Sequence, residues 1–331
     1  MEYMKAQFPK GLPTLKELKA ANSGKEVPPE TAWIWGKDDE IAKLGRINLL
    51  TPERIRSAKD KEVKDGDVVS LNWDIKLPSQ PAFGRQPCKH TISTVPGSEY
   101  IFDDWLDMNI QSGSQWDGFR HYGHIGHKKL YNNLDPSEVL SGTKCGMNVM
   151  SDHGIVGRGV LLDYYSWALE NGKPYDPLTS HAITVEDLEA VARAQGITFE
   201  VGDILLVRSG YTARYYELER ENPQRLKEAG VESPNLAGVE QSEEMKEWLH
   251  DHYFAAVAGD APAFEVWPGN PDWKLHEYLL ALWGVLIGEM FDLEALSKQC
   301  KAKKRWSFLF ISSPLNSPGG VASLANALTI H

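Results

Sequence analysis

Several features that define common protein classes are missing from this chain of 331 residues. Its three cysteines, Cys88, Cys145 and Cys300, are far apart and provide neither a disulfide framework nor paired Cys-x-x-Cys zinc ligands. No stretch of about eighteen uncharged apolar residues is present, and the N-terminus lacks an apolar run of signal-peptide length. We therefore expect a soluble protein of a reducing, cytoplasmic compartment, with no membrane partner.

Positive charge is also in short supply. The formal net charge is −11, from 35 lysines and arginines against 46 aspartates and glutamates. A nucleic-acid binder needs a basic face to displace counterions from phosphates. The short basic run at 301–305, Lys-Ala-Lys-Lys-Arg, fits a solvated helix end better than such a face. The sequence thus predicts no nucleic-acid partner.

Motifs for phosphate binding and for nucleophilic serine are missing or incomplete. Gly157-Arg-Gly is too short for a dinucleotide fingerprint, and Gly113-Ser-Gln lacks the second glycine of a nucleophile elbow. A triad of Ser114, His121 and Asp117 stays open as an alternative, although the spacing does not demand it. Without these motifs, metal-dependent chemistry is the main candidate that the sequence offers.

Helix and strand patterns mix without strict alternation, which predicts an α/β fold with a mixed sheet and one core. Thr184 and Asp187 form a capping box for a helix that stops at Gly196, and residues 39–60 carry a helical signal with an N-cap at Thr51. A further helix is expected at 240–250, and a helix or helix–strand junction at 276–287. Apolar strands are expected at 68–73, 157–163, 201–210, 254–260 and 306–312.

The chain divides into a short arm and one large domain. Residues 1–35 are polar and interrupted by prolines, and we expect an arm that packs on the body or on a neighbouring subunit. Residues 36–331 show no internal repeat and no low-complexity linker. They are expected to form a single catalytic domain.

Two groups of polar residues could carry chemistry. The first lies in segment 97–127, which lacks long apolar periodicity and is expected to form loops and short strands, where functional residues tend to lie. It contains Gln111, Gln115, Asp117, His121, His124 and His127. The second contains Asp260, His276 and Glu289. A divalent metal needs several oxygen or imidazole donors that converge on one point. Simpler interpretations stay open: a polar histidine face, a turn aspartate, or a histidine with an ordinary hydrogen-bond partner.

Glu289 is the most informative member, because it lies in the apolar sequence Gly284-Val-Leu-Ile-Gly-Glu289-Met-Phe. A buried carboxylate is costly unless it is paired, hydrogen-bonded or bound to a metal. We therefore group Asp117, His276 and Glu289 as candidate metal ligands.

The segment 111–121 resembles the hallmark His-x-Gly-Thr-His-x-Asp-x-Pro-x-His of the cyclase-like metal hydrolases, a family that includes bacterial kynurenine formamidase and isatin hydrolase. Here it reads Gln-Ser-Gly-Ser-Gln-Trp-Asp-Gly-Phe-Arg-His, so glutamines replace two histidines. It is similar to a subgroup motif, Gln-Trp-Asp-Gly-Leu-Arg-His. Further blocks at 157–163, 202–210, 259–262, 276–289 and 314–320 follow in the family's order, and together the resemblance covers roughly residues 60–325.

The resemblance implies a swivelling β/β/α fold and assembly as a homodimer or homotetramer. It implies that Asp117, His276 and Glu289 hold one metal position, that Gln111 and Gln115 stand at a second, and that His121 is the general base. Amide oxygens are weaker ligands than imidazole for late transition metals. We therefore expect one ion, Mn²⁺ or Zn²⁺, although an empty site with Gln115 as an oxyanion donor stays open.

The resulting prediction is a metal-dependent hydrolase that cleaves an amide C–N bond or a lactone of a small cyclic or aromatic compound. His121 and Gln115 are the expected catalytic residues, and Trp116, Phe119 and Tyr122 are expected to shape the pocket. Two alternatives remain: a metal-independent lyase or cyclase on the same scaffold, and a small-molecule binding protein without activity.

Overall fold

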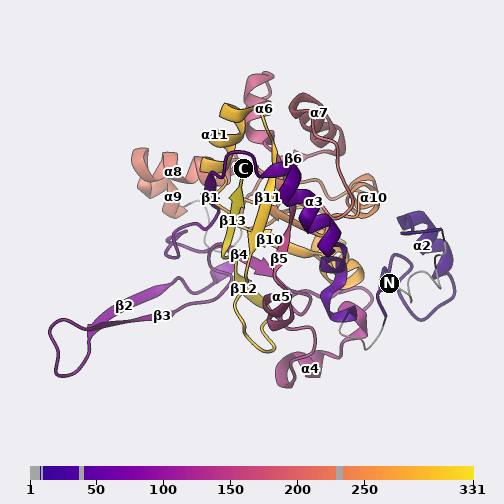
Figure 1. Ribbon diagram of the computed structural model, residues 1–331, viewed down its shortest axis with the longest axis horizontal. Helices are drawn as coiled ribbons and strands as arrows, with labels where there is room; N and C mark the ends of the chain where they lie inside the picture. Colours follow the sequence, from indigo (N-terminus) through magenta and orange to yellow (C-terminus); the bar gives the residue numbers. More distant parts are fainter. Residues whose placement is uncertain (1–7, 9, 37–40, 229–233) are drawn as a thin grey trace.

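The computed structural model describes residues 8, 10–36, 41–228 and 234–331, and it is organised around one mixed sheet (Figure 1). Its nine strands follow the order β1 (Val68–Ser70), β13 (Ala327–Ile330), β11 (Ser307–Ser312), β5 (Ile155–Leu162), β7 (Ile204–Val207), β9 (Ala256–Gly259), β10 (Leu286–Glu289), β4 (Gln115–Asp117) and β12 (Ala322–Leu324). The predicted α/β mixed-sheet class is confirmed, and the strands expected near 68, 157, 204, 256 and 307 are all present.

The centre of the sheet is parallel and its two sides are antiparallel. Strands β5, β7, β9 and β10 run parallel to one another, whereas β11 and β4 pair antiparallel at either side. Every residue of β7, β9 and β10 is buried. Parallel strands are covered on both faces, which explains their continuous apolar runs in the sequence.

Helices cover the sheet (Figure 1). In chain order they are α2 (Leu15–Ala21), α3 (Pro52–Glu62), α4 (Pro136–Ser141), α5 (Met147–His153), α6 (Tyr164–Glu170), α7 (Val185–Gln195), α8 (Tyr211–Glu221), α9 (Pro223–Glu228), α10 (Glu243–Asp251) and α11 (Glu294–Lys303). Shorter 3-10 turns lie at η1 (Ala42–Leu49), η2 (Ala82–Gly84) and η3 (Tyr131–Asn133), and η4 (Glu277–Trp283) is a π-helix. A small parallel pair joins β6 (Ala182–Ile183) to β8 (Gly238–Val239).

The predicted helix caps are confirmed. Thr184 caps α7 with Asp187 as its capping-box partner, and Gly196 ends the helix in the left-handed conformation. Thr51 caps α3, and Pro52 occupies the first turn. Residues 39 and 40 of the expected 39–60 helical segment lie outside the described residues. These helix ends could be predicted from the sequence because caps depend on neighbouring residues rather than on distant contacts.

The described part of the N-terminal segment packs on the chain's own body. Leu15 and Leu18 of α2 are buried, and the Leu15 amide donates a 2.8 Å hydrogen bond to the Asp251 carboxylate of α10. Further along, the Trp33 indole donates to the Ala281 carbonyl at 2.8 Å. Residues 10–36 therefore tie α10 and η4 together.

A long hairpin projects from the body, and half of it was not predicted. Strands β2 (Lys89–Thr94) and β3 (Phe102–Asp107) pair only with each other, and all residues of β3 are exposed. Figure 1 shows this ribbon extending away from the sheet. Segment 97–127 was expected to contain loops and short strands, which fits β3 and β4 but not β2. Burial does not alternate along the hairpin, so the usual strand pattern is missing.

Among the described residues, no helix is long and apolar enough to cross a membrane.

Candidate metal centre

Strand pairing decides which side chains reach the candidate site. In the antiparallel β4–β10 pair, Gln115 lies opposite Glu289 and Asp117 lies opposite Ile287. Successive side chains of a strand point to opposite faces, so Gln115 and Asp117 share one face with Glu289. Trp116 between them must point to the other face. Gln115 and Asp117 therefore lie on the site side of the strand, together with Glu289, and Trp116 lies on the core side.

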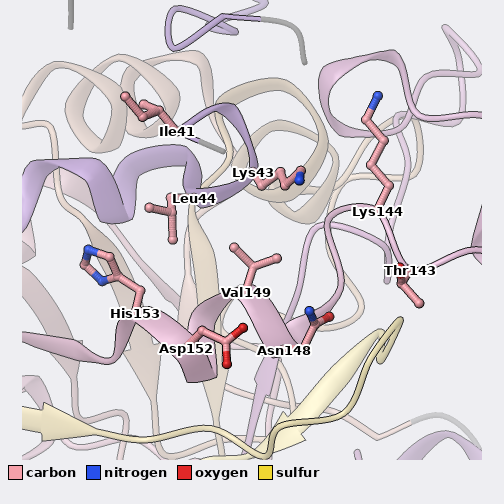
Figure 2. A pocket seen from close by; sticks show the side chains of 9 residues that line it. All are labelled: Ile41, Lys43, Leu44, Thr143, Lys144, Asn148, Val149, Asp152 and His153. Carbon is pink, nitrogen blue, oxygen red and sulfur yellow. The ribbon is translucent and has the colours of Figure 1, made fainter. Parts of the chain in front are cut away.

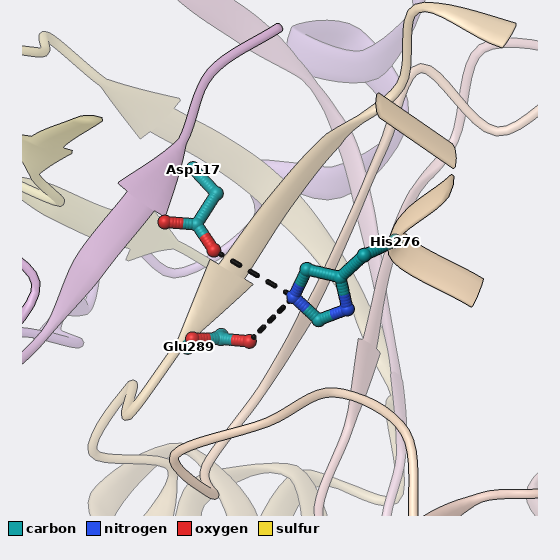
Figure 3. A group of neighbouring side chains, drawn as sticks. All are labelled: Asp117, His276 and Glu289. Atoms are coloured by element: carbon teal, nitrogen blue, oxygen red, sulfur yellow. Dashed lines mark hydrogen bonds and ion pairs between the residues drawn. The ribbon is translucent and has the colours of Figure 1, made fainter. Parts of the chain in front are cut away.

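The site side gathers three possible ligands from distant parts of the chain. Asp117 comes from β4, Glu289 ends β10, and His276 directly precedes η4 (Figure 3). His276 Nε2 lies 3.2 Å from Glu289 Oε1 and 3.7 Å from Asp117 Oδ2. One ligand atom from each residue lies within 4.8 Å of the others. This group can hold a metal ion.

Two buried oxygens in this cluster lack a hydrogen-bond partner. They are Asp117 Oδ2 and Gln115 Oε1, in residues that are fully buried. A buried acceptor without a partner costs roughly 1–3 kcal/mol, and more when it is charged. A cation coordinated here would satisfy the carboxylate oxygen, and a rotated Gln115 amide would supply a further neutral oxygen. The residues present therefore fit a divalent ion.

The two glutamines contact the carboxylates through their amide nitrogens. Gln111 Nε2 donates to Asp117 Oδ1 at 2.6 Å and lies 3.2 Å from His121 Nδ1. Gln115 Nε2 donates to Glu289 Oε2 at 2.8 Å and to Asp117 Oδ1 at 3.3 Å. In this arrangement the amide nitrogens contact the carboxylates, and both amides stabilise the negative charge of the cluster.

Burial of two carboxylates next to each other shifts their protonation. Burial and the neighbouring Asp117 charge raise the pKa of Glu289 to about 7. Burial opposes ionisation of Asp117 as well, but His121 and His276 more than compensate and lower its pKa. Asp117 thus carries the firmer negative charge.

The pKa values of the two histidines shift in opposite directions. Burial disfavours the charged form of His276, but its contacts with Asp117, Glu265 and Glu289 outweigh this and raise its pKa well above the ordinary value. Burial also lowers the pKa of His121, which Asp117 opposes only in part. His121 is therefore the neutral base of the pair.

Glu265 holds His276 in place and was not predicted from the sequence. Its carboxylate accepts hydrogen bonds from His276 Nδ1 at 2.5 Å and from the His276 amide at 3.0 Å. A carboxylate on Nδ1 directs Nε2 toward the other two ligands and makes it a stronger donor to metal. Glu265 lies in the apolar stretch Ala-Pro-Ala-Phe-Glu-Val-Trp, so the reasoning applied to Glu289 would have found it.

A cavity of about 160 Å³ opens above the ligands and reaches His121, His276 and Glu289. Its other walls are apolar or cationic side chains: Phe83, Arg85, Tyr122, Pro262, Ala263, Trp267 and Lys274. Of the three residues predicted to shape the pocket, Tyr122 lines it. The remaining wall comes from residues near 83 and 267 that sequence spacing gave no reason to connect.

Trp116 and Phe119 lie in the core instead of the pocket. The Trp116 indole is edge-on to Phe291 at 5.1 Å and donates to the Ser312 hydroxyl at 3.0 Å. Phe119 packs on Tyr131 with ring centroids 4.5 Å apart. Both are fully buried. The expectation that they shape the pocket does not agree with these positions, because strand alternation turns Trp116 away from the site.

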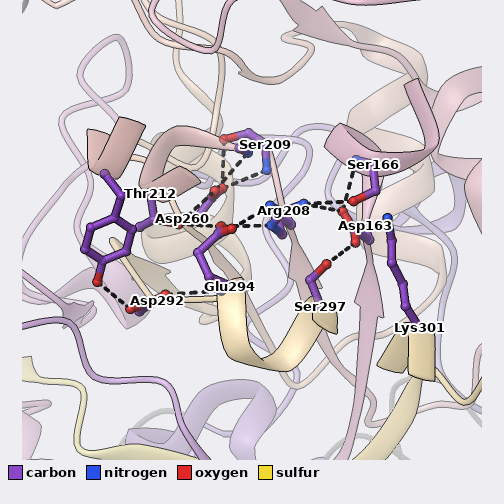
Figure 4. A network of polar contacts seen from close by, with 12 residues as sticks. Asp163, Ser166, Arg208, Ser209, Thr212, Asp260, Asp292, Glu294, Ser297 and Lys301 are labelled. Atoms are coloured by element: carbon purple, nitrogen blue, oxygen red, sulfur yellow. Dashed lines mark hydrogen bonds and ion pairs between the residues drawn. The ribbon is translucent and has the colours of Figure 1, made fainter. Parts of the chain in front are cut away.

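Other candidates from the two polar groups have separate roles. Asp260 accepts from the Ser209 and Gly210 amides at 2.7 and 2.8 Å and belongs to the Arg208 network of Figure 4. His124 pairs with Glu277 at 3.1 Å. The Ser114 hydroxyl is bonded to the Met290 carbonyl and the Trp73 amide, which gives no support to a serine triad.

A second hollow of about 700 Å³ lies away from these residues, near α5 and η1 (Figure 2). None of the predicted site residues lines it. Four of the predicted site residues, His121, Tyr122, His276 and Glu289, line the smaller cavity instead.

Comparison with known proteins places the chain in a family. The sequence profile of the Cyclase family matches residues 78–266. A solved structure described as a novel cyclase is 30% identical, covers 90% of this chain and 98% of its own, and superimposes with a TM-score of 0.75. The chain belongs to the cyclase family. None of the curated proteins matches it.

Solved structures of lower identity share the fold. Isatin hydrolase A from Ralstonia solanacearum is 16% identical, with a TM-score of 0.53, over 80% of this chain and 91% of its own. Isatin hydrolase A from Labrenzia aggregata, solved with benzyl benzoate, is 14% identical, with a TM-score of 0.55, over 80% and 93%. The predicted resemblance to a family that includes isatin hydrolase is confirmed.

The role of Glu265 can be tested by metal affinity. Glu265→Gln removes the negative charge that contacts His276 Nδ1. We expect it to weaken binding of Mn²⁺ or Zn²⁺ by about 10- to 100-fold, as for other carboxylate–histidine pairs. Competition with a chromophoric chelator measures the dissociation constant. Glu247→Gln, on the exposed side of α10, is the matched control. Unchanged affinity in Glu265→Gln would show that the contact does not support a metal ligand.

Proposed function

We propose that this chain is a metal-dependent hydrolase that cleaves an amide C–N bond or a lactone of a small cyclic or aromatic compound. The observation that supports it best is the buried group of Asp117, His276 and Glu289, which opens onto an aromatic-lined cavity. One carboxylate oxygen of this group, Asp117 Oδ2, has no hydrogen-bond partner. Buried charge of this kind, at the end of a cavity, is typical of an active site.

Asp117, His276 and Glu289 would hold one divalent ion, Mn²⁺ or Zn²⁺. Two carboxylates and one imidazole suit either ion. When bound, the ion would supply Lewis-acid polarisation of the scissile carbonyl. The chain's own residues then bind the substrate ring, direct the attacking water and move its proton.

His121 would accept the proton of the attacking water. Its ring lies at the cavity wall and its Nε2 is 3.7 Å from Asp117 Oδ2. The lowered pKa keeps the imidazole neutral near pH 7, and the adjacent carboxylate stabilises the imidazolium formed after proton transfer. Activity should therefore decline as His121 becomes protonated at low pH.

Gln111 and Gln115 would control the orientation of these groups. Gln111 Nε2 contacts both His121 Nδ1 and Asp117 Oδ1, so it would fix the orientation of the His121 ring beside the carboxylate. Gln115 is bonded to both carboxylates and would either add its oxygen to the ion or direct its amide at the substrate oxygen.

The family comparison supports hydrolysis, since two structures with this fold are described as isatin hydrolases. A metal-independent lyase or cyclase and a binding protein without activity are the alternatives. Activity that survives complete removal of metal by a chelator would favour the lyase or cyclase. Ligand retention with no product would favour the binding protein.

Replacing His121 separates proton transfer from metal binding. We expect His121→Ala to lower turnover of aryl formamides, cyclic amides or lactones by about 10²- to 10⁴-fold, because the general base is lost. Metal content, measured by elemental analysis, should remain near that of the unaltered chain. His153→Ala, on the exposed end of α5, is the control. Loss of metal together with activity would identify His121 as a ligand and contradict this role.

We also propose that the chain forms a homodimer or homotetramer. Six large apolar side chains are exposed on or beside the β2–β3 hairpin: Ile92, Tyr100, Ile101, Phe102, Trp105 and Leu106. The pairing register places Ile92, Phe102 and Leu106 on one face of the ribbon. A lone two-stranded ribbon is marginally stable in water, so an exposed apolar face supports self-association.

Sedimentation velocity tests the assembly. Ile92→Asp with Leu106→Asp should shift a dimer or tetramer toward the monomer, because the substitutions bury charge in the contact. Ser93→Asp, on the other face of the ribbon, should have little effect. A chain that sediments as a monomer before any substitution would contradict the proposal.

A further inference from the structure

The cavity above the ligands contains two cations that the proposed chemistry does not use. Arg85 and Lys274 both line it, although most of its wall is apolar. Arg85 donates one hydrogen bond, 2.8 Å to the Gln111 carbonyl, and Lys274 donates to the Asn270 carbonyl. Neither forms an ion pair with a carboxylate of the described residues. Most of the donors on the Arg85 guanidinium are therefore available to a ligand.

Of the other arginines with limited exposure, Arg46 and Arg120 donate to backbone carbonyls, and two more are paired with carboxylates. Arg158 contacts Glu62 and Asp203 at 3.0 and 2.8 Å. Arg208 contacts Asp163 and Glu294 at 2.8 and 2.7 Å (Figure 4). A guanidinium with little exposure normally acquires carboxylate or carbonyl partners, because desolvating an unpaired charge is unfavourable. Arg85 has a single hydrogen bond and no carboxylate at ion-pair distance among the described residues, and it lines a cavity that a ligand could enter.

Aromatic rings hold both cations in the wall. The Arg85 guanidinium lies 5.4 Å from the centroid of Phe83, and Lys274 Nζ lies 5.6 Å from that of Trp267. The two rings are themselves edge-to-face at 5.4 Å. Ring contacts of this kind orient a cation without neutralising it. The wall therefore offers an apolar surface for a ring beside positive charge for an anionic group.

The cavity is small. Its volume of about 160 Å³ is close to the roughly 150 Å³ of an apolar cavity that binds benzene. A single ring fits, and a fused multi-ring compound would have to extend through the opening. A guanidinium recognises a carboxylate with two parallel hydrogen bonds, which suits a planar acid better than a neutral amide.

We propose that Arg85 and Lys274 select single-ring substrates that carry a carboxylate, so that the natural substrate is an acidic aryl amide or lactone. The part of this inference that concerns the reaction rests on the proposed hydrolase function. The preference for binding a carboxylate does not depend on it. Arg85 acts as the main carboxylate-binding residue and Lys274 adds a second positive charge.

Matched ligands test the selection by charge. Benzoate and benzamide have the same ring and nearly the same size, and isothermal titration calorimetry of the metal-loaded chain gives the affinity of each. We expect benzoate to bind at least about tenfold more tightly, as one charge-assisted contact provides. Arg85→Gln should remove this preference and leave benzamide affinity within about twofold. Lys274→Gln should reduce the preference by a smaller factor.

Two controls complete the binding test. Arg56→Gln makes the same charge change on exposed α3 and should preserve the preference. Metal content, measured in every variant, excludes an indirect effect through the ligand cluster. Equal affinities for the two ligands, no benzoate binding, or equal weakening of both by Arg85→Gln would overturn the proposal.

Hydrolysis of 4-formamidobenzoate and 4-formamidobenzamide separates this inference from the proposed function. If both hold, the acid has the lower KM, and Arg85→Gln raises that KM by about tenfold with little change in kcat. Equal hydrolysis of both compounds supports the function and overturns the selection. Benzoate binding that depends on Arg85 without hydrolysis of either compound supports the selection and contradicts the function.

Discussion

Burial of two carboxylates side by side is the constraint on which the rest of the site depends. Asp117 and Glu289 lie on neighbouring strands with 0% and 1% of their surface exposed. Water cannot solvate them, so the protein must supply compensating groups. His276, the amides of Gln111 and Gln115, and the Glu265 contact that orients His276 all serve this purpose. One carboxylate oxygen remains unsatisfied, which a cation would complete.

The sheet imposes this arrangement on the motif. Because β4 pairs with β10, residues two apart in the motif share the site face and the residue between them enters the core. The same alternation explains why Gln115 and Asp117 belong together and why Trp116 does not. The linear sequence alone gives no reason to treat Gln115, Trp116 and Asp117 differently. In the strand, Trp116 points to the opposite face from the other two.

Local signals predicted much of the fold. The caps of α3 and α7, the buried parallel strands and the mixed-sheet class all depend on residues close in sequence. Glu289 could be identified as a candidate because its apolar sequence neighbours predicted that it is buried. The cavity wall could not be predicted, since Phe83, Arg85 and Trp267 meet Tyr122 only through the folded chain. The β2 strand was missed because an exposed ribbon has no alternation of burial.

The two glutamines supply most of the hydrogen bonds to the buried carboxylates. Their nitrogens stabilise the carboxylates, so the second position implied by the family's histidine motif contains amides in place of imidazoles. Elemental analysis of the purified chain, saturated with Mn²⁺ or Zn²⁺ and then desalted, tests the account most directly. We expect one ion per chain, and its loss in Asp117→Asn. Two ions, no ion, or one ion that persists in Asp117→Asn would contradict it.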